Sequence, residues 1–205
     1  DSQAAAILQA WHAGSEAGHG IADVLFGDYN PSGKLPMSFP RHVGQAPLYY
    51  NQKNTGRPGP RPEVFWTHYT DSPNTPLYPF GFGLSYTQFD YSDLALDRDS
   101  IALDDEVTVS ITLTNVGDRD GSEVVQLYIR DRVASITRPV KELKGFNKVF
   151  LVAGESTEIT FTLGYEELGF YGSDGTYRLE PGVFDVLIGS DSDQLTGVSF
   201  TVQQP

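Results

Sequence analysis

Four residues between positions 57 and 71 could together bind a sugar. Arg57, Trp66, Tyr69 and Asp71 lie in the stretch 41–85, which is rich in Pro, Gly and aromatic residues and shows no clear period. Aromatic rings stack on the faces of sugars, and Arg and Asp supply paired hydrogen bonds to hydroxyl groups. We therefore predict that these four residues form the substrate-binding rim of a sugar pocket.

The aromatic residues of this stretch also have a purely structural interpretation. Pro58, Pro60 and Pro62 favour an extended backbone, and a flexible linker is usually more polar than this segment. We expect an ordered connector pressed on a surface, whose rings hold the second half of the chain to what precedes it. Both interpretations stay open: a sugar-binding rim, and a structural role that we call the glue interpretation. The rim, if formed, would belong to the same molecule or to a neighbouring subunit of a homodimer.

Acidic residues are the next candidates, because the hydrolysis of a glycosidic bond usually needs two carboxyl groups. The chain has 27 acidic residues, so a pair of them proves nothing by itself. Glu16 is the most arguable, since it lies in a glycine-rich loop of apparent α/β material, and such folds place ligands at loops that follow strands. We add Glu16 to the substrate-binding candidates and assign no catalytic residue. Asp118 and Asp120 lie in a predicted β-turn and are expected to be structural.

Metal and nucleotide sites are not expected. The chain has no Cys, and its four histidines, His12, His19, His42 and His68, are not joined by a dense group of carboxylates. The segment 27–34 resembles a phosphate loop only at first sight, because five residues separate its glycines and Leu follows the Lys. We expect no metal and no cofactor.

Charge and composition exclude several classes of partner. The net charge of −13 argues against binding to nucleic acid and to an anionic membrane surface. No apolar run approaches the ~20 residues of a membrane span. The start of the chain has no basic region typical of a signal peptide. The absence of Cys fits the cytosol or the periplasm and chooses neither.

The first 40 residues read as part of an α/β domain. The apolar run 4–11 predicts a helix end or a buried strand, and 14–20 predicts a glycine-rich loop. A helix should follow, because Ile21, Val24 and Leu25 recur at helical spacing and Gly27 is a plausible stop. One helix and one strand cannot bury both of their faces, so this segment requires a sheet that lies upstream. We expect residues 1–40 not to fold alone.

The second half predicts an antiparallel β-sandwich that folds by itself over residues 86–205. Apolar residues alternate with polar ones in short runs separated by turn residues. These runs are centred on Val107–Leu113, Val125–Ile129, Ile159–Leu163 and Phe184–Ile188. Phe170, Tyr171 and Tyr177 are the best candidates there for clustered exposed aromatics. The fold class is therefore mainly β, with an α/β remnant at 1–40 and the connector at 41–85.

Long ordered strings give the chain a resemblance to a known family. The end of the second domain of family 3 glycoside hydrolases resembles residues 11–41 (WHAGSEAGHGIADVLFGDYNPSGKLPMSFPR). The entry into the third domain of that family resembles residues 76–89 (PLYPFGFGLSYTQF). Residues 138–149, 153–156 and 180–192 resemble that third domain, which is fibronectin type III-like. The chain as a whole resembles the C-terminal part of three-domain bacterial β-glucosidases.

The resemblance implies a parent enzyme and a role for this part of it. In the family the nucleophilic Asp lies in an N-terminal barrel and the acid/base Glu lies earlier in the second domain, so neither matches a position here. The implied parent is a periplasmic or secreted retaining β-glucosidase that acts on β-glucosides or cello-oligosaccharides. This chain would be inactive alone and would supply scaffold and rim. The alternative is a stand-alone, non-catalytic carbohydrate-binding or interaction module.

Overall fold

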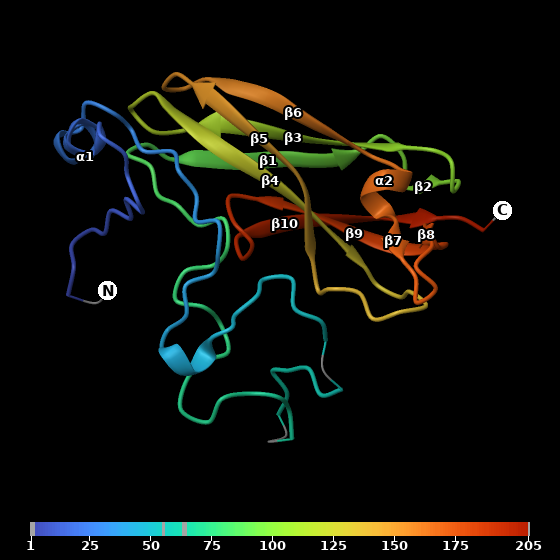
Figure 1. Cartoon of the computed structure of the whole chain (residues 1–205). Helices are drawn as coiled ribbons and strands as arrows, with labels where there is room; N and C mark the ends of the chain where they lie inside the picture. Colours follow the sequence, from blue (N-terminus) through green and yellow to red (C-terminus); the bar gives the residue numbers. More distant parts are fainter. Residues whose placement is uncertain (1–2, 55, 63–64, 205) are drawn as a thin grey trace.

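Alternating apolar residues build a β-sandwich over the second half of the chain (Figure 1). The computed structural model describes residues 3–54, 56–62 and 65–204. Its elements in chain order are α1 (Ala17–Phe26), the 3-10 turn η1 (Val43–Gln45), β1 (Phe89–Leu96), β2 (Ser100–Ile101), β3 (Val107–Asn115), β4 (Gly121–Asp131), β5 (Glu142–Leu151), β6 (Ser156–Leu163), α2 (Tyr165–Leu168), β7 (Phe170–Tyr171), β8 (Tyr177–Arg178), β9 (Gly182–Gly189) and β10 (Leu195–Val202).

Two sheets enclose the core. One has three antiparallel strands in the order β1-β3-β6, and the other has five strands in the order β2-β10-β9-β4-β5. In the larger sheet only β2 and β10 run parallel. The predicted mainly β fold is confirmed.

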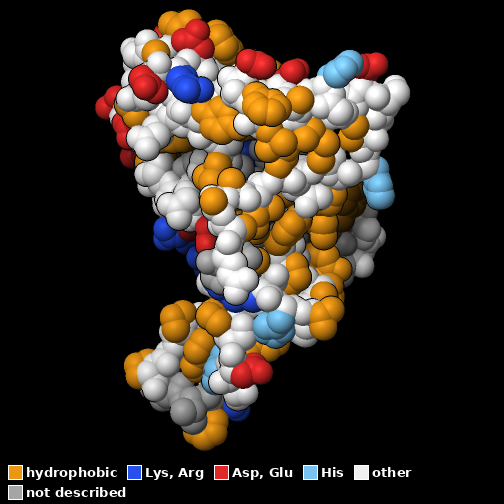
Figure 2. All heavy atoms as spheres, turned by 90° about the vertical axis from the view of Figure 1, so that its left-hand side faces the viewer, with side chains coloured by type: hydrophobic (Ala, Val, Ile, Leu, Met, Phe, Trp, Pro, Cys, Tyr) orange, Lys and Arg blue, Asp and Glu red, His pale blue; other side chains and the backbone are white. Residues whose placement is uncertain are grey.

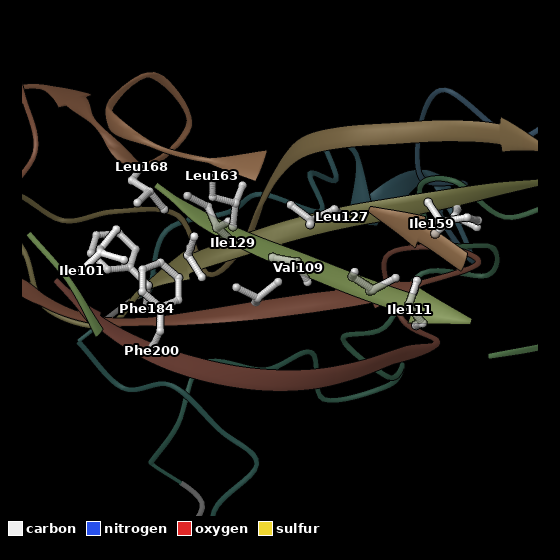
Figure 3. Close-up of a cluster of buried hydrophobic side chains, with 14 of the residues drawn as sticks. Ile101, Val109, Ile111, Leu127, Ile129, Ile159, Leu163, Leu168, Phe184 and Phe200 are labelled. Carbon is white, nitrogen blue, oxygen red and sulfur yellow. The ribbon is translucent and has the colours of Figure 1, made fainter. Parts of the chain in front are cut away.

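The period of two explains which side chains form the core. Along β3 buried and half-buried residues alternate without a break, so Val107, Val109, Ile111 and Leu113 all point between the sheets. Figure 3 shows Val109 and Ile111 of this strand in the same buried cluster as Leu127, Ile129, Phe184 and Phe200 of the facing sheet. The Ser and Thr residues between them face outwards and are partly exposed.

The first segment differs from its prediction in two places. The helix α1 includes Ile21, Val24 and Leu25 and ends at Gly27, whose φ of +85° is left-handed, as predicted. Its first turn, however, takes in Gly18 and Gly20, which we expected in a loop. The run 4–11 is irregular and exposed rather than a helix end or a buried strand, because no described strand lies beside it to pair with its backbone.

Large hydrophobic side chains remain exposed on the α1 side of the molecule. Figure 2 shows them gathered on the face that carries the N-terminal segment. They include Ile7, Trp11, Leu25, Phe26, Met37 and Leu84. None of the helices in the described residues has the length and apolar character needed to cross a membrane.

Candidate functional site

A lobe formed by residues 41–75 extends from the body of the molecule (Figures 1 and 2). Its two ends leave the body side by side, because backbone hydrogen bonds of 2.8 Å join the chain before the lobe to the chain after it. Leu35 bonds to Phe82 and Gly81, and Phe39 bonds to Tyr78 and Leu77. The chain therefore departs after residue 40 and returns before residue 76 at the same place.

A buried amide closes the base of the lobe. Gln45 is only 1% exposed; its Oε1 accepts from the Arg41 backbone at 2.6 Å, and its Nε2 donates to the Pro73 carbonyl at 2.8 Å. Arg41 adds a bond from its Nε to the Thr75 carbonyl at 3.0 Å. These contacts join the first and last turns of the lobe, since a buried polar group is stable only when its hydrogen bonds are made.

The rings of the connector fall into two groups. In the first, Tyr50 stacks on Phe80 with centroids 4.3 Å apart and meets the fully buried Tyr128 edge-on at 5.7 Å. The Tyr50 hydroxyl accepts from the Leu143 backbone at 3.3 Å, and the Gln52 carbonyl accepts from that of Val140 at 2.9 Å. This group docks the connector on β4 and β5, as the glue interpretation requires.

The second group lies out in the lobe and contains the predicted rim residues. Trp66 is half-buried and stacks on the exposed His68 at 4.3 Å and 23°. It also lies against Gly59, where an added Cβ would be 2.1 Å from the indole, so only glycine fits there. Tyr69 meets His42 edge-on at 6.0 Å. Trp66 and Tyr69 thus contact rings of other lobe residues, whereas Tyr50 contacts rings outside the lobe.

Backbone bonds bring the remaining rim candidates to the same lobe. Thr67 donates its N–H to the Arg57 carbonyl at 2.9 Å, which sets Arg57 beside the segment that carries Trp66. Asn74 closes the turn around Asp71, accepting from the Tyr69 backbone at 3.0 Å and donating to the Thr67 carbonyl at 2.8 Å. Asp71 itself is exposed.

Glu16 is not brought to this lobe. It is the N-cap of α1, which lies at the upper left in Figure 1, whereas the lobe extends below the body. Its carboxylate is 2.9 Å from His19 Nδ1, and both side chains are more than four-fifths exposed. From the sequence, the two histidines of the lobe, His42 and His68, are weighed only as metal ligands. The signal for a contact between His68 and Trp66 is their spacing, because residues two apart lie on the same side of an extended chain.

A cavity of about 610 Å³ opens where the lobe meets the sandwich, between Asn54 and residues 130–139, which are the end of β4 and the loop after it. Arg138 forms its charged floor, with one nitrogen 2.6 Å from Glu142 and another 3.4 Å from Asp131. Burial raises the pKa of the Asp131 carboxyl, although Arg138 opposes the shift. No group of three acidic or histidine side chains suited to a metal ion occurs in the residues that the structure describes.

Two family models match separate parts of the chain. Residues 1–86 match the glycosyl hydrolase family 3 C-terminal domain, and residues 123–192 match the fibronectin type III-like domain. Over 202 residues the chain is 52% identical to the periplasmic beta-glucosidase of Salmonella typhimurium and 46% identical to a beta-xylosidase of Formosa agariphila. These matches cover 98% and 96% of this chain but 26% and 27% of the relatives.

Solved structures agree. The β-glucosidase of Listeria innocua in complex with glucose superposes with a TM-score of 0.89 at 44% identity, over 95% of this chain and 27% of that one. A β-glucosidase of Erythrobacter marinus superposes with a TM-score of 0.84 at 49% identity, over 91% and 24%. The chain thus spans about a quarter of the length of the relatives it matches.

Proposed function

Because the chain belongs to glycoside hydrolase family 3, we propose that it is the C-terminal portion of a retaining β-glucosidase that hydrolyses terminal β-glucosides. The observation that carries this proposal is the match of 202 residues, at 52% identity, to the C-terminal quarter of a β-glucosidase. In a retaining mechanism one carboxylate attacks the sugar and a second acts as acid and then as base. We assign both groups to the upstream part of the parent protein.

This chain would then act as scaffold and as substrate rim. The exposed apolar side chains around α1 would pack on the upstream part of the α/β domain, since large exposed apolar patches usually mark an interface. The sandwich would hold the lobe through Tyr50 and Phe80. This division of roles follows the predicted parts 1–40, 41–85 and 86–205.

The rim itself is proposed on the chemistry of the lobe. His68 is exposed and Trp66 is half-buried, so the stacked pair meets solvent on the side of His68 and offers a sugar a flat surface. Tyr69 adds a second ring, and Arg57 and Asp71 add a donor and an acceptor for hydroxyl groups. Because the lobe extends from the body, it could complete a pocket in its own molecule or in the neighbouring subunit of a homodimer. Glu16 stays a separate candidate for the upstream side of the same pocket.

The substrate and the compartment are proposed by analogy. A β-glucoside or cello-oligosaccharide follows from the β-glucosidase relatives, and a periplasmic or secreted location follows from the relative of Salmonella typhimurium. The 46% identity to a beta-xylosidase favours a second candidate function, the hydrolysis of β-xylosides.

The test compares the isolated 205-residue chain with the full-length parent on aryl β-glucoside and aryl β-xyloside. We expect the parent to hydrolyse the glucoside faster and the isolated chain to hydrolyse neither. Faster turnover of the xyloside would favour the second function. Turnover by the isolated chain, abolished by changing one of its own acids, would overturn the assignment of catalysis to the upstream part.

A further inference from the structure

A short hairpin at one end of the sandwich carries three tyrosines on a rigid base. It comprises α2, β7 and β8, which connect β6 to β9. Leu168, Phe170 and Leu179 anchor it in the core with at most 8% exposure. The Arg138 guanidinium lies 4.6 Å over the Phe170 ring and fixes it from the other side. Phe170, expected from the sequence to be an exposed aromatic, is therefore buried.

The three rings form one group, which we call the tyrosine cluster: Tyr165, Tyr171 and Tyr177. Tyr177 stands in the middle, edge-on to Tyr165 at 5.5 Å and to Tyr171 at 4.9 Å. The Tyr165 hydroxyl donates to the Tyr177 carbonyl at 2.9 Å, and the Tyr177 hydroxyl donates to the Glu166 carbonyl at 2.6 Å. Two rings are thus held in place, while Tyr171 is 68% and Tyr165 46% exposed.

Polar groups that could bind hydroxyls lie beside the rings. Arg178 pairs with Asp174 at 2.5 Å, and the Asp174 side chain is 57% exposed. The guanidinium lies against Gly172, where an added Cβ would be 3.0 Å from its Cζ. Hydrogen bonds from Arg178 and from the Thr176 backbone lower the pKa of Asp174, the latter most strongly, so the carboxylate stays an acceptor at neutral pH.

We propose that the tyrosine cluster is a second carbohydrate site, which binds a neutral β-linked glucan chain away from the lobe. The choice of a glucan rests on the proposed function. Exposed rings next to a fixed ion pair suit sugar faces and hydroxyls. A stable protein partner would need about 800 Å² on each side, far more than three rings provide. The net charge of −13 also disfavours an anionic ligand.

The position of the cluster keeps it available in a longer protein. In Figure 1 the hairpin lies at the opposite end of the sandwich from α1. The apolar side chains that we assign to the upstream domain surround α1, so that domain and the cluster would occupy different ends. A glucan held here would raise the concentration of chain ends near the parent enzyme.

The experiment is native electrophoresis of the 205-residue chain through gels that contain increasing soluble mixed-linkage β-glucan. We expect retardation, with a dissociation constant about tenfold higher for Tyr171→Ala, since one stacked ring is lost. Tyr171→Phe should keep most of the retardation. Phe146→Ala is the matched control, because Phe146 on β5 is equally exposed at 68%.

Two results of the electrophoresis would overturn the inference. These are no retardation of the original chain, and retardation that Tyr171→Ala leaves intact, whether or not Trp66→Ala abolishes it. Sedimentation that shows a dimer broken by Tyr171→Ala would also overturn it, in favour of a protein interface. Hydrolysis of an aryl β-glucoside by the parent is a separate readout: hydrolysis without retardation refutes only this inference, and retardation without hydrolysis refutes only the proposed function.

Discussion

The Lys34 ammonium group lies 2.7 Å from the Glu123 carboxylate, and both side chains are largely buried. Lys34 comes directly before the paired segment 35–39 that leads to the lobe, and Glu123 belongs to β4 of the sandwich. Lys34 also donates to the Gly83 carbonyl at 3.3 Å. This pair therefore ties the N-terminal segment, the end of the connector and the sandwich together at one point.

We predict that Lys34→Met lowers the free energy of unfolding of the sandwich by about 3 kcal/mol, because it leaves the Glu123 carboxylate buried without its partner. Urea unfolding of the 205-residue chain measures this. The double variant Lys34→Met/Glu123→Leu should recover most of the loss. Arg98→Ala is the control, since its pair with Asp97 is exposed and should contribute far less to the free energy of unfolding. Equal effects of Lys34→Met and Arg98→Ala would contradict the prediction.

Gly81→Ala should destabilise the junction between connector and sandwich. Gly81 has a φ of +82°, and an added Cβ would lie 2.0 Å from Gln126 Oε1. The change would displace an amide that donates to the Gly81 and Ser190 carbonyls and accepts from Tyr128. We expect a loss of about 3 kcal/mol in thermal or urea unfolding.

The comparison for that prediction is Gly154→Ala. Gly154 has nearly the same φ, +80°, but an added Cβ there meets open space. Only the strain of alanine in a left-handed backbone conformation remains, so the free energy of unfolding should fall by about 1 kcal/mol. If the two variants unfold alike, the contact with Gln126 is not what makes Gly81 necessary.

Asp97 should stabilise the chain at neutral pH and lose this effect in acid. Its pKa is lowered by the hydrogen bond from the Thr108 backbone, at 2.8 Å, and less strongly by Arg98. A lowered folded-state pKa stabilises the fold above the unfolded value, about 4, and this contribution is lost as the pH falls through the folded value. Asp97→Asn should therefore lower the melting temperature at pH 7 and much less at pH 2.5.

The control variant for the acid limb is Arg98→Ala, which removes the weaker cause and keeps the Thr108 bond. It should preserve most of the pH dependence. An Asp97→Asn variant whose melting temperature differs from the original by the same amount at both pH values would refute the assignment.

Variants in the two groups of connector rings should differ in whether they change the kinetics or the stability. In the full-length parent, Trp66→Ala should raise the KM for a cello-oligosaccharide about tenfold and leave the melting temperature unchanged, because the Trp66 ring packs within the lobe. Tyr50→Ala should instead destabilise the protein by about 2 kcal/mol, since it removes packing on Phe80 and Tyr128. A lower melting point with unchanged kinetics for Trp66→Ala would leave only the glue interpretation.

The sequence was sufficient for features that depend on local period and turn chemistry. Val107–Leu113 alternates, so its burial pattern follows directly, and Gly27 ends a helix as predicted. Asp120 accepts from the Ala153 backbone and is structural, as expected of a turn residue. Contacts between distant segments were out of reach, because no local pattern pairs Lys34 with Glu123 or sets Arg138 over Phe170.

The candidate site shows the same limit. Composition predicted an ordered aromatic connector but could not divide its rings, since Tyr50 and Trp66 stand in similar surroundings along the sequence. Only the return of the chain to Tyr78 shows which rings lie on the sandwich and which lie beyond it. The exposed His68 is a candidate because its ring stacks on Trp66, a contact that composition does not predict.

The pairing of residues 35–39 with 77–82, together with the docking of Tyr50, leaves the tip of the lobe a replaceable part. Both ends of the excursion are fixed before residue 41 and after residue 75, so insertions or deletions at its tip leave the junction as it is. Doubling the length of a flexible loop costs only about 0.6 kcal/mol in closure entropy. Related enzymes could therefore exchange specificity by exchanging this tip, and a chimaera that keeps Gln45, Tyr50 and Thr75 and carries another relative's residues only between positions 53 and 73 should fold as readily as the original.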